Sequence, residues 1–158
     1  MTTQDKLIAL YGNPMVDQLA FEKSFMTWFD IPSIINNHVP ALPNKLYCHK
    51  ELVLPLTNVL TDLIKSSWLY GQIKTYDGCF NVRYVRGSRT VVSVHSFGLA
   101  IDLNASQNPL GLSTDEALLR GLKPFDKMFF EVWRSHGFTC GIDFKRPDGM
   151  HFQYTKNL

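Results

Sequence analysis

The segment Ser93–Asp102, SVHSFGLAID, constrains the fold more than any other part of the chain. It places a histidine and an aspartate on either side of a glycine within a largely apolar stretch. Glycine adopts positive φ without strain, so Gly98 predicts a sharp turn just after His95. If residues 99–104 form the strand that follows, the two polar side chains converge across that turn.

Alternate side chains of a strand point to opposite faces, so Ile101 and Leu103 are predicted to face the core. The opposite face then carries Ala100, Asp102 and Asn104. The small side chain of Ala100 leaves room there. A neutral imidazole that converges with a carboxylate in a polar spot is an arrangement that binds metal ions. We therefore interpret the histidine before the turn and the aspartate after it as metal ligands.

A second motif, DGMHFQ, occupies residues 148–153. On a closing strand over residues 150–154, Met150 and Phe152 point inward and His151 points to the opposite face, which makes His151 the third predicted ligand. Two histidines and one carboxylate leave one position open, as in zinc hydrolases that activate water. Imidazole combined with carboxylate favours zinc over magnesium or calcium, which prefer oxygen ligands.

Asp148 precedes His151 by three residues, across Gly149. It can lie beside the open position without binding the ion, and act there as general base and then as proton donor to a leaving amine. Taken alone, the Asp-Gly pair would indicate only a turn. The two motifs together favour the metal interpretation, because each explains the polar residues of the other.

Other interpretations of these residues are weaker. A catalytic triad of Ser93, His95 and Asp102 would lack a nucleophile elbow and a separate oxyanion loop, since the serine and histidine share one short strand. Three further histidines are expected to be surface or hydrogen-bonded residues: His38, His49 and His136.

The length of 158 residues predicts one domain over residues 1–158, with an irregular or helical N-terminal segment over 1–44 and a catalytic core over 45–155. Apolar spacing predicts helices over 17–29, 52–68 and 125–135. It predicts strands over 73–76, 91–94, 99–104 and 150–154. Few helices and several short strands in mixed order indicate an α+β fold with a small, mostly antiparallel sheet.

Composition excludes several classes of protein. A formal net charge of +2 is too small to predict a nucleic-acid partner, and no stretch approaches the roughly 20 apolar residues of a membrane-spanning helix. Three cysteines without close spacing, Cys48, Cys79 and Cys140, are expected to be buried free thiols in a reducing compartment. The N-terminus shows no export signal, so we expect synthesis in a cytoplasm, and a monomer.

These residues resemble a known family, the zinc peptidases of peptidoglycan. It comprises VanY-like D-alanyl-D-alanine carboxypeptidases and phage L-alanyl-D-glutamate endopeptidases. The family signature, S-x-H-x-x-G-x-A-x-D and later D/E-x-x-H with an aromatic, is matched by Ser93, His95, Gly98, Ala100, Asp102, Asp148, His151 and Phe152. The resemblance covers roughly residues 45–155 and does not extend to residues 1–44. Two departures are Gln153, where glutamate is frequent, and Cys140, where tryptophan is common.

The resemblance implies a fold of the Hedgehog and D-Ala-D-Ala peptidase type. It implies one zinc ion per chain, held by His95, Asp102 and His151. Asp148 would be the catalytic base. Arg83, in a segment like the one that supplies an arginine in the family, would polarise the scissile carbonyl and hold its developing oxyanion. Arg86 is the second candidate for that role or for substrate binding, and Ser93 would bind substrate or orient a ligand.

By this resemblance, we expect a zinc-dependent peptidase that cleaves the peptide stem of bacterial peptidoglycan. The absent export signal favours an L-alanyl-D-glutamate endopeptidase that acts as a phage endolysin, or a virion component, over an exported D-alanyl-D-alanine carboxypeptidase. A third alternative is a non-catalytic, zinc-stabilised module that binds wall peptides or a protein, since Hedgehog-type relatives have such a site without evident hydrolysis. A cytoplasmic hydrolase of other D-amino-acid dipeptides is the weakest alternative.

Overall fold

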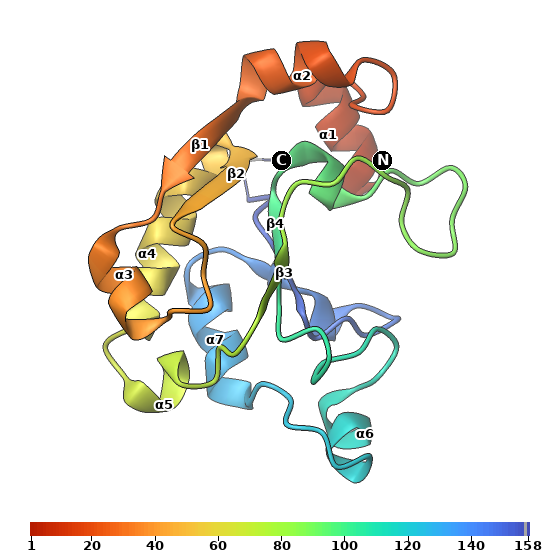
Figure 1. Cartoon of the computed structure of the whole chain (residues 1–158). Helices are drawn as coiled ribbons and strands as arrows, with labels where there is room; N and C mark the ends of the chain where they lie inside the picture. Colours follow the sequence, from red (N-terminus) through yellow and green to blue (C-terminus); the bar gives the residue numbers. More distant parts are fainter. Residues whose placement is uncertain (157) are drawn as a thin grey trace.

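Two antiparallel sheets with helices around them make up the computed structural model, which describes residues 1–156 and residue 158 (Figure 1). The larger sheet has the strand order β3–β4–β6–β5, with bounds Tyr76–Gly78, Ala100–Leu103, His151–Gln153 and Thr139–Cys140. The smaller sheet pairs β1 (Met26–Asp30) with β2 (Lys45–His49). The expected α+β fold with antiparallel strands is confirmed.

The centre of the larger sheet is the pair β4 and β6. Ile101 is opposite Phe152, and Asp102 is opposite His151. Ile101, Leu103 and Phe152 are fully buried, as the strand alternation predicts. The prediction for the other face is only partly correct. Ala100 is also fully buried and is not among the residues that line the cavity described below.

The segment before β4 differs from the prediction. Residues 91–94 do not form a strand, because Val92 makes only an isolated bridge with Tyr84, and Val94–Phe97 form a 3₁₀-helix, η2. The side chain of Ser93 accepts a hydrogen bond from the backbone N–H of His95 and caps this turn. Gly98 ends it in the left-handed conformation, with φ of 65°, as the sequence indicates.

The N-terminal 44 residues are more regular than predicted. They contain helices α1 (Thr3–Tyr11), α2 (Gln18–Phe25) and α3 (Ser33–His38), together with β1. The single helix predicted over 17–29 is wrong beyond Phe25. From Met26 onward the chain is extended and hydrogen-bonded to β2, so pairing with a distant segment outweighs local helical spacing.

The predicted helix over 52–68 is divided into α4 (Val53–Leu63) and α5 (Ser67–Tyr70). Pro55 lies in the first turn of α4, where backbone N–H groups have no intrahelical acceptor and proline is tolerated. Helix α7 (Lys127–Ser135) confirms the prediction for 125–135, and Asp126 caps it. Helices α4 and α7 contact each other. Large buried side chains fill the core: Phe97, Phe125, Phe129, Trp133 and Phe152.

The remaining short elements are η1 (Lys50–Leu52), α6 (Thr114–Leu119) and η3 (Gly141–Asp143). The three cysteines are buried free thiols, as expected. Within residues 1–156 and 158, no helix combines the length and apolar character that crossing a bilayer requires.

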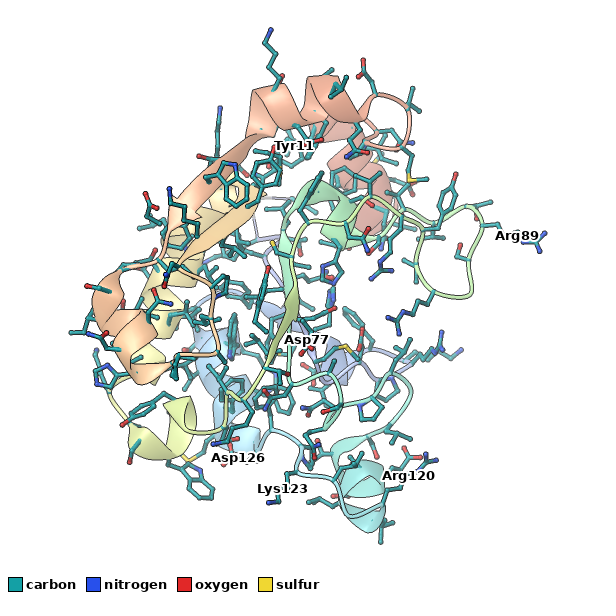
Figure 2. The ribbon with its side chains drawn as sticks, viewed as in Figure 1. Tyr11, Asp77, Arg89, Arg120, Lys123 and Asp126 are labelled. Atoms are coloured by element: carbon teal, nitrogen blue, oxygen red, sulfur yellow. The ribbon has the colours of Figure 1, made fainter. Side chains whose placement is uncertain are left out.

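A long loop separates β3 from η2 and doubles back on itself. Its two sides are joined by the N–H of Val85, which donates to the carbonyl of Val91, and by the bridge between Tyr84 and Val92. Arg89 lies at the tip of this loop and points away from the molecule (Figure 2). The loop extends beside the end of α1 in Figure 1, and its base lines the cavity described below.

Candidate metal centre

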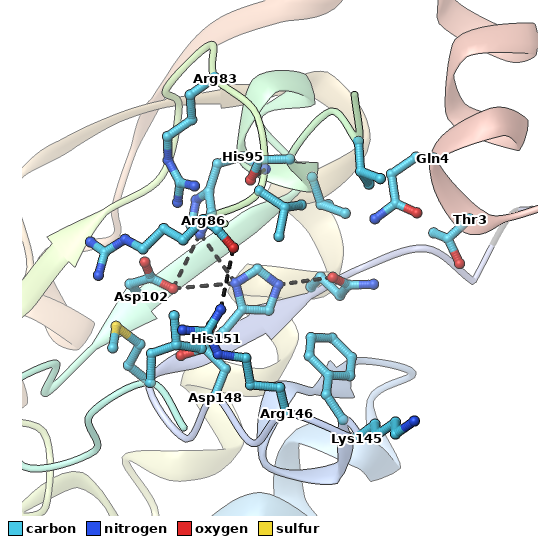
Figure 3. A pocket seen from close by; sticks show the side chains of 18 residues that line it. Thr3, Gln4, Arg83, Arg86, His95, Asp102, Lys145, Arg146, Asp148 and His151 are labelled. Atoms are coloured by element: carbon cyan, nitrogen blue, oxygen red, sulfur yellow. Dashed lines mark hydrogen bonds and ion pairs between the residues drawn. The ribbon is translucent and has the colours of Figure 1, made fainter. Parts of the chain in front are cut away.

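Three side chains from separate elements converge on one point (Figure 3). His95 comes from η2, Asp102 from β4 and His151 from β6. His95 Nε2 lies 3.1 Å from His151 Nδ1 and 3.2 Å from Asp102 Oδ1. Asp102 Oδ1 lies 3.4 Å from His151 Nδ1. The structure therefore brings together the three residues that the sequence predicts as ligands.

Backbone geometry explains why they meet. The antiparallel register places Asp102 and His151 on neighbouring strands at the same level. The turn at Gly98 brings η2 back toward β4, and a side chain at that position would have no space. A Cβ there would lie 2.7 Å from Met26 Sδ and 2.8 Å from the backbone nitrogen of His49.

The outer nitrogen of each imidazole is hydrogen-bonded to an oxygen. His95 Nδ1 lies 2.7 Å from the carbonyl oxygen of Cys79, and His151 Nε2 lies 2.8 Å from Gln153 Oε1. Both oxygens can only accept hydrogen bonds, so the outer nitrogens donate. In the neutral rings, His95 Nε2 and His151 Nδ1 therefore present lone pairs to the centre, as metal ligands do.

Three acceptor atoms thus face one another in a buried place. Asp102 Oδ1 is buried and has no hydrogen-bond partner among the described residues. A cation between the three atoms would remove their mutual repulsion. A tetrahedral zinc ion with ligands at about 2.0–2.2 Å needs ligand atoms roughly 3.3–3.5 Å apart, close to the separations observed. The donor set and its spacing therefore fit zinc.

Without a metal ion, the pKa values of Asp102 and His151 are shifted from their ordinary values. Burial would raise the pKa of Asp102, but the two histidines hold it well below its usual range. Burial would lower the pKa of His151. Asp102 and Gln153 accept hydrogen bonds from the charged ring, and this raises the pKa of His151 above its ordinary value. The pocket therefore stabilises positive charge at its centre, which a divalent ion also supplies.

Asp148 lies beside this centre and lines the same cavity, of about 430 Å³. Its Oδ1 is buried and lacks a hydrogen-bond partner among the described residues, and burial raises the pKa of its carboxyl group. The backbone holds it closely, because its N–H donates to the carbonyl of Gly141 at 2.8 Å. A Cβ at Gly141 would overlap the carbonyl oxygen of Asp148.

A comparison with known families matches residues 86–154 to the model described as D-alanyl-D-alanine carboxypeptidase. This segment, which is less than half of the chain, is therefore similar to that peptidase family. The match spans all three converging side chains and Asp148, and it confirms the resemblance inferred from the motifs. Members of the family are zinc enzymes. No curated protein and no solved structure matches the chain.

Arg83 lies outside the family match, whereas Arg86 and Ser93 lie within it, and all three line the cavity. In Figure 3 the side chains of Arg83 and Arg86 extend toward the side of the centre occupied by Asp102. Ser93 is buried, and its hydroxyl accepts the N–H of His95. Its position supports a role in holding the ligand segment, which was one of its two expected roles.

Several residues that contribute to this site were not predicted from the sequence. Gln153 was noted only as a departure from the family, although two residues of separation on a strand put it on the same face as His151. Thr3 and Gln4 of α1 line the cavity, and no sequence signal pointed to them. Lys145 and Arg146 also line it.

The other three histidines lie elsewhere and are hydrogen-bonded, as expected. His38 Nδ1 contacts the carbonyl of Ile34, and His136 Nε2 contacts Asp62. His49 is almost fully buried among aromatic rings, and its Nδ1 accepts the N–H of Glu51. Burial lowers the pKa of His49 to about 4.

Proposed function

We propose that this protein is a zinc-dependent peptidase that cleaves the peptide stem of bacterial peptidoglycan. One observation carries the proposal. Three acceptor atoms, from His95, Asp102 and His151, lie at the spacing of a tetrahedral zinc site, and the unpaired carboxyl group of Asp148 lines the same cavity. That arrangement is the one required for hydrolysis with a positioned base.

Bound zinc would supply a Lewis acid and lower the pKa of a water molecule toward about 7. Asp148 takes the proton of the attacking water. Its raised pKa suits it to hold that proton and then to deliver it to the departing amine. Arg83 lines the cavity as a fixed cation and stabilises the negative charge that develops on the scissile carbonyl oxygen.

We further propose that the bond cleaved is L-alanyl-D-glutamate and that the protein acts as a phage endolysin, reaching the wall from the cytoplasm with the help of another factor. Its three buried free thiols are typical of folding in a reducing compartment. The second candidate is a D-alanyl-D-alanine carboxypeptidase. The matching family, described as D-alanyl-D-alanine carboxypeptidase, favours that alternative.

A stem pentapeptide that contains both bonds tests these proposals in one digestion. Loss of the N-terminal alanine indicates the endopeptidase, and loss of the C-terminal D-alanine indicates the carboxypeptidase, as read by mass spectrometry. EDTA should abolish cleavage and zinc should restore it. A protein that binds zinc and the peptide but releases neither product would instead be a non-catalytic binding module.

A further inference from the structure

Four cationic side chains line the catalytic cavity: Arg83, Arg86, Lys145 and Arg146. None of them forms an ion pair with a carboxylate of the described residues. The acidic residues that line the cavity are Asp102 and Asp148, which belong to the metal centre and its base. The cavity therefore carries positive charge that the chain itself does not neutralise.

Among the described residues, some cations outside the cavity form ion pairs, whereas others, such as Arg89 and Arg120, do not. Elsewhere in the chain, Arg134 binds the carboxylate of Asp143 through two hydrogen bonds of 2.9 and 2.8 Å. Arg86 and Arg146 have no such partner, although a guanidinium group is well suited to bind a carboxylate with two parallel hydrogen bonds. An unpaired guanidinium at the rim of a binding cavity is available to a ligand.

Arg86 and Arg146 come from loops on opposite sides of the metal centre, and a hydrogen bond joins them. Arg146 Nη1 donates to the backbone carbonyl of Arg86 at 3.3 Å. Figure 3 shows the side chain of Arg146 reaching across the cavity near Asp148 to make this contact, whereas Lys145 points away from the three converging side chains. This contact holds the guanidinium group of Arg146 against the backbone of Arg86, so the two residues lie at neighbouring parts of the rim.

Part of the remaining lining is apolar and partly exposed. Val85, Val91 and Phe144 line the cavity and keep more than a third of their surface accessible. They offer contact to small apolar side chains such as the methyl groups of alanine. A ligand that fits this rim combines short apolar side chains with a negative charge.

We propose that Arg86 and Arg146 form a carboxylate subsite, which makes the enzyme selective for stem peptides with a free carboxylate next to the scissile bond. The inference rests on the proposed peptidase function and deepens it. Arg83 is assigned to the reacting carbonyl and is not part of this subsite. The carboxylate has two possible sources in a stem peptide, the D-glutamate residue or the C-terminal D-alanine.

The experiment compares three versions of the stem pentapeptide. In one both carboxylates are free, in the second the glutamate carboxylate is amidated, and in the third the C-terminus is amidated. Arg86→Gln and Arg146→Gln are compared with wild type. Arg89→Gln is the matched control, because it removes the same charge from the same loop as Arg86 but at a position that points away from the molecule (Figure 2).

For the wild type, we expect kcat/KM to fall about 10- to 100-fold when one of the two carboxylates is amidated, since a charge-assisted hydrogen bond is lost. The amide that causes the fall identifies the source. We compare kcat/KM for the peptide with free carboxylates to kcat/KM for the amidated peptide. Arg86→Gln and Arg146→Gln should bring the ratio of these two values close to one, mainly through KM. Arg89→Gln should keep the wild-type ratio. Arg86→Gln leaves intact the backbone carbonyl that binds Arg146, so it tests charge without breaking that contact.

Two outcomes overturn the subsite. One is equal cleavage of all three peptides by the wild type. The other is a preference for free carboxylate that both arginine variants retain. Failure of the wild type to cleave any of the three peptides, with zinc bound, would instead refute the proposed function, and the subsite with it.

Discussion

Asp102 and His151 lie directly opposite each other on β4 and β6, with Asp102 Oδ1 3.4 Å from His151 Nδ1. Two of the three candidate ligand atoms are thus positioned by one pair of opposite residues in the sheet. Only His95 depends on a turn, the one that Gly98 ends. Most of the metal site is therefore built before any ion binds, which reduces the conformational freedom lost on binding.

His151→Ala should lose zinc binding and the stability that zinc provides. A ligand that binds only the folded state stabilises it by about 2.7 kcal/mol at 100 times its dissociation constant, so zinc should raise the melting temperature of the wild type. In the variant we expect little or no rise. His38→Ala is the control, because this exposed histidine lies outside the site. Equal zinc content and equal melting shifts in the two variants would exclude His151 as a ligand.

Asp148→Asn should keep stoichiometric zinc and lose activity. The carboxyl group is assigned to proton transfer, which contributes about 10²- to 10⁴-fold to rate, and not to metal binding. Metal analysis and kcat on the stem pentapeptide check this prediction. Asp115→Asn, on the exposed start of α6, should change neither quantity. Loss of zinc from Asp148→Asn would show that the residue is a ligand, contrary to its assignment.

Gln153→Leu should weaken zinc binding about 10- to 100-fold, as the loss of a hydrogen-bond partner of a metal ligand commonly does. Gln153 Oε1 accepts the Nε2 proton of His151 at 2.8 Å and thereby keeps the lone pair on Nδ1. Gln153→Glu preserves the acceptor and should retain the affinity. Competition with a chelator measures the constants, and nitrogen chemical shifts of the metal-free protein report the His151 tautomer. Unchanged affinity in Gln153→Leu would contradict the role.

The sequence was sufficient to predict which three candidate ligands converge, because short motifs contain them. The glycine before β4 and the alternation along two strands predicted which side chains converge, and the structure agrees for Ile101, Leu103 and Asp102. The paired motifs also supported a family resemblance that the comparison confirms.

The N-terminal segment could not be predicted in the same way. The strand from Met26 forms because a distant segment, β2, pairs with it, and local spacing in that stretch suits a helix equally well. Thr3 and Gln4 reach the cavity through the packing of α1, whose buried Leu7 anchors it to the core. Such long-range packing leaves no local pattern.

The stabilising effect of zinc should grow as pH rises from below about 6.5 into the alkaline range. In the metal-free protein, the pKa of His151 is raised, mainly by Asp102 against the effect of burial. The stability from protonated His151 is fully present below its unfolded pKa of about 6.5 and is lost as pH rises through the higher folded value. Zinc requires the unprotonated ring, so protons compete with it at low pH.

Melting temperatures with EDTA and with excess zinc, measured across this range, check the prediction. The difference between the two curves should widen with pH in the wild type and stay flat in His151→Ala. A constant difference in the wild type would mean that no proton is displaced when zinc binds. His49, whose pKa is lowered to about 4, does not disturb the test, because its contribution to stability is the same with EDTA and with zinc and cancels in the difference between the two curves.

Gly98→Ala should destabilise the protein more than Gly12→Ala does. Both glycines have positive φ, 65° and 81°, so alanine is strained at each by roughly 1 kcal/mol or more. Only at Gly98 does a Cβ also meet neighbouring atoms, at 2.7 Å from Met26 Sδ, whereas nothing lies within 4 Å at Gly12. Overpacking of this kind adds about 1–3 kcal/mol. Urea denaturation of both variants measures the difference, and zinc affinity should fall only for Gly98→Ala, because its turn positions His95. Equal destabilisation and unchanged affinity would show that the turn tolerates a side chain.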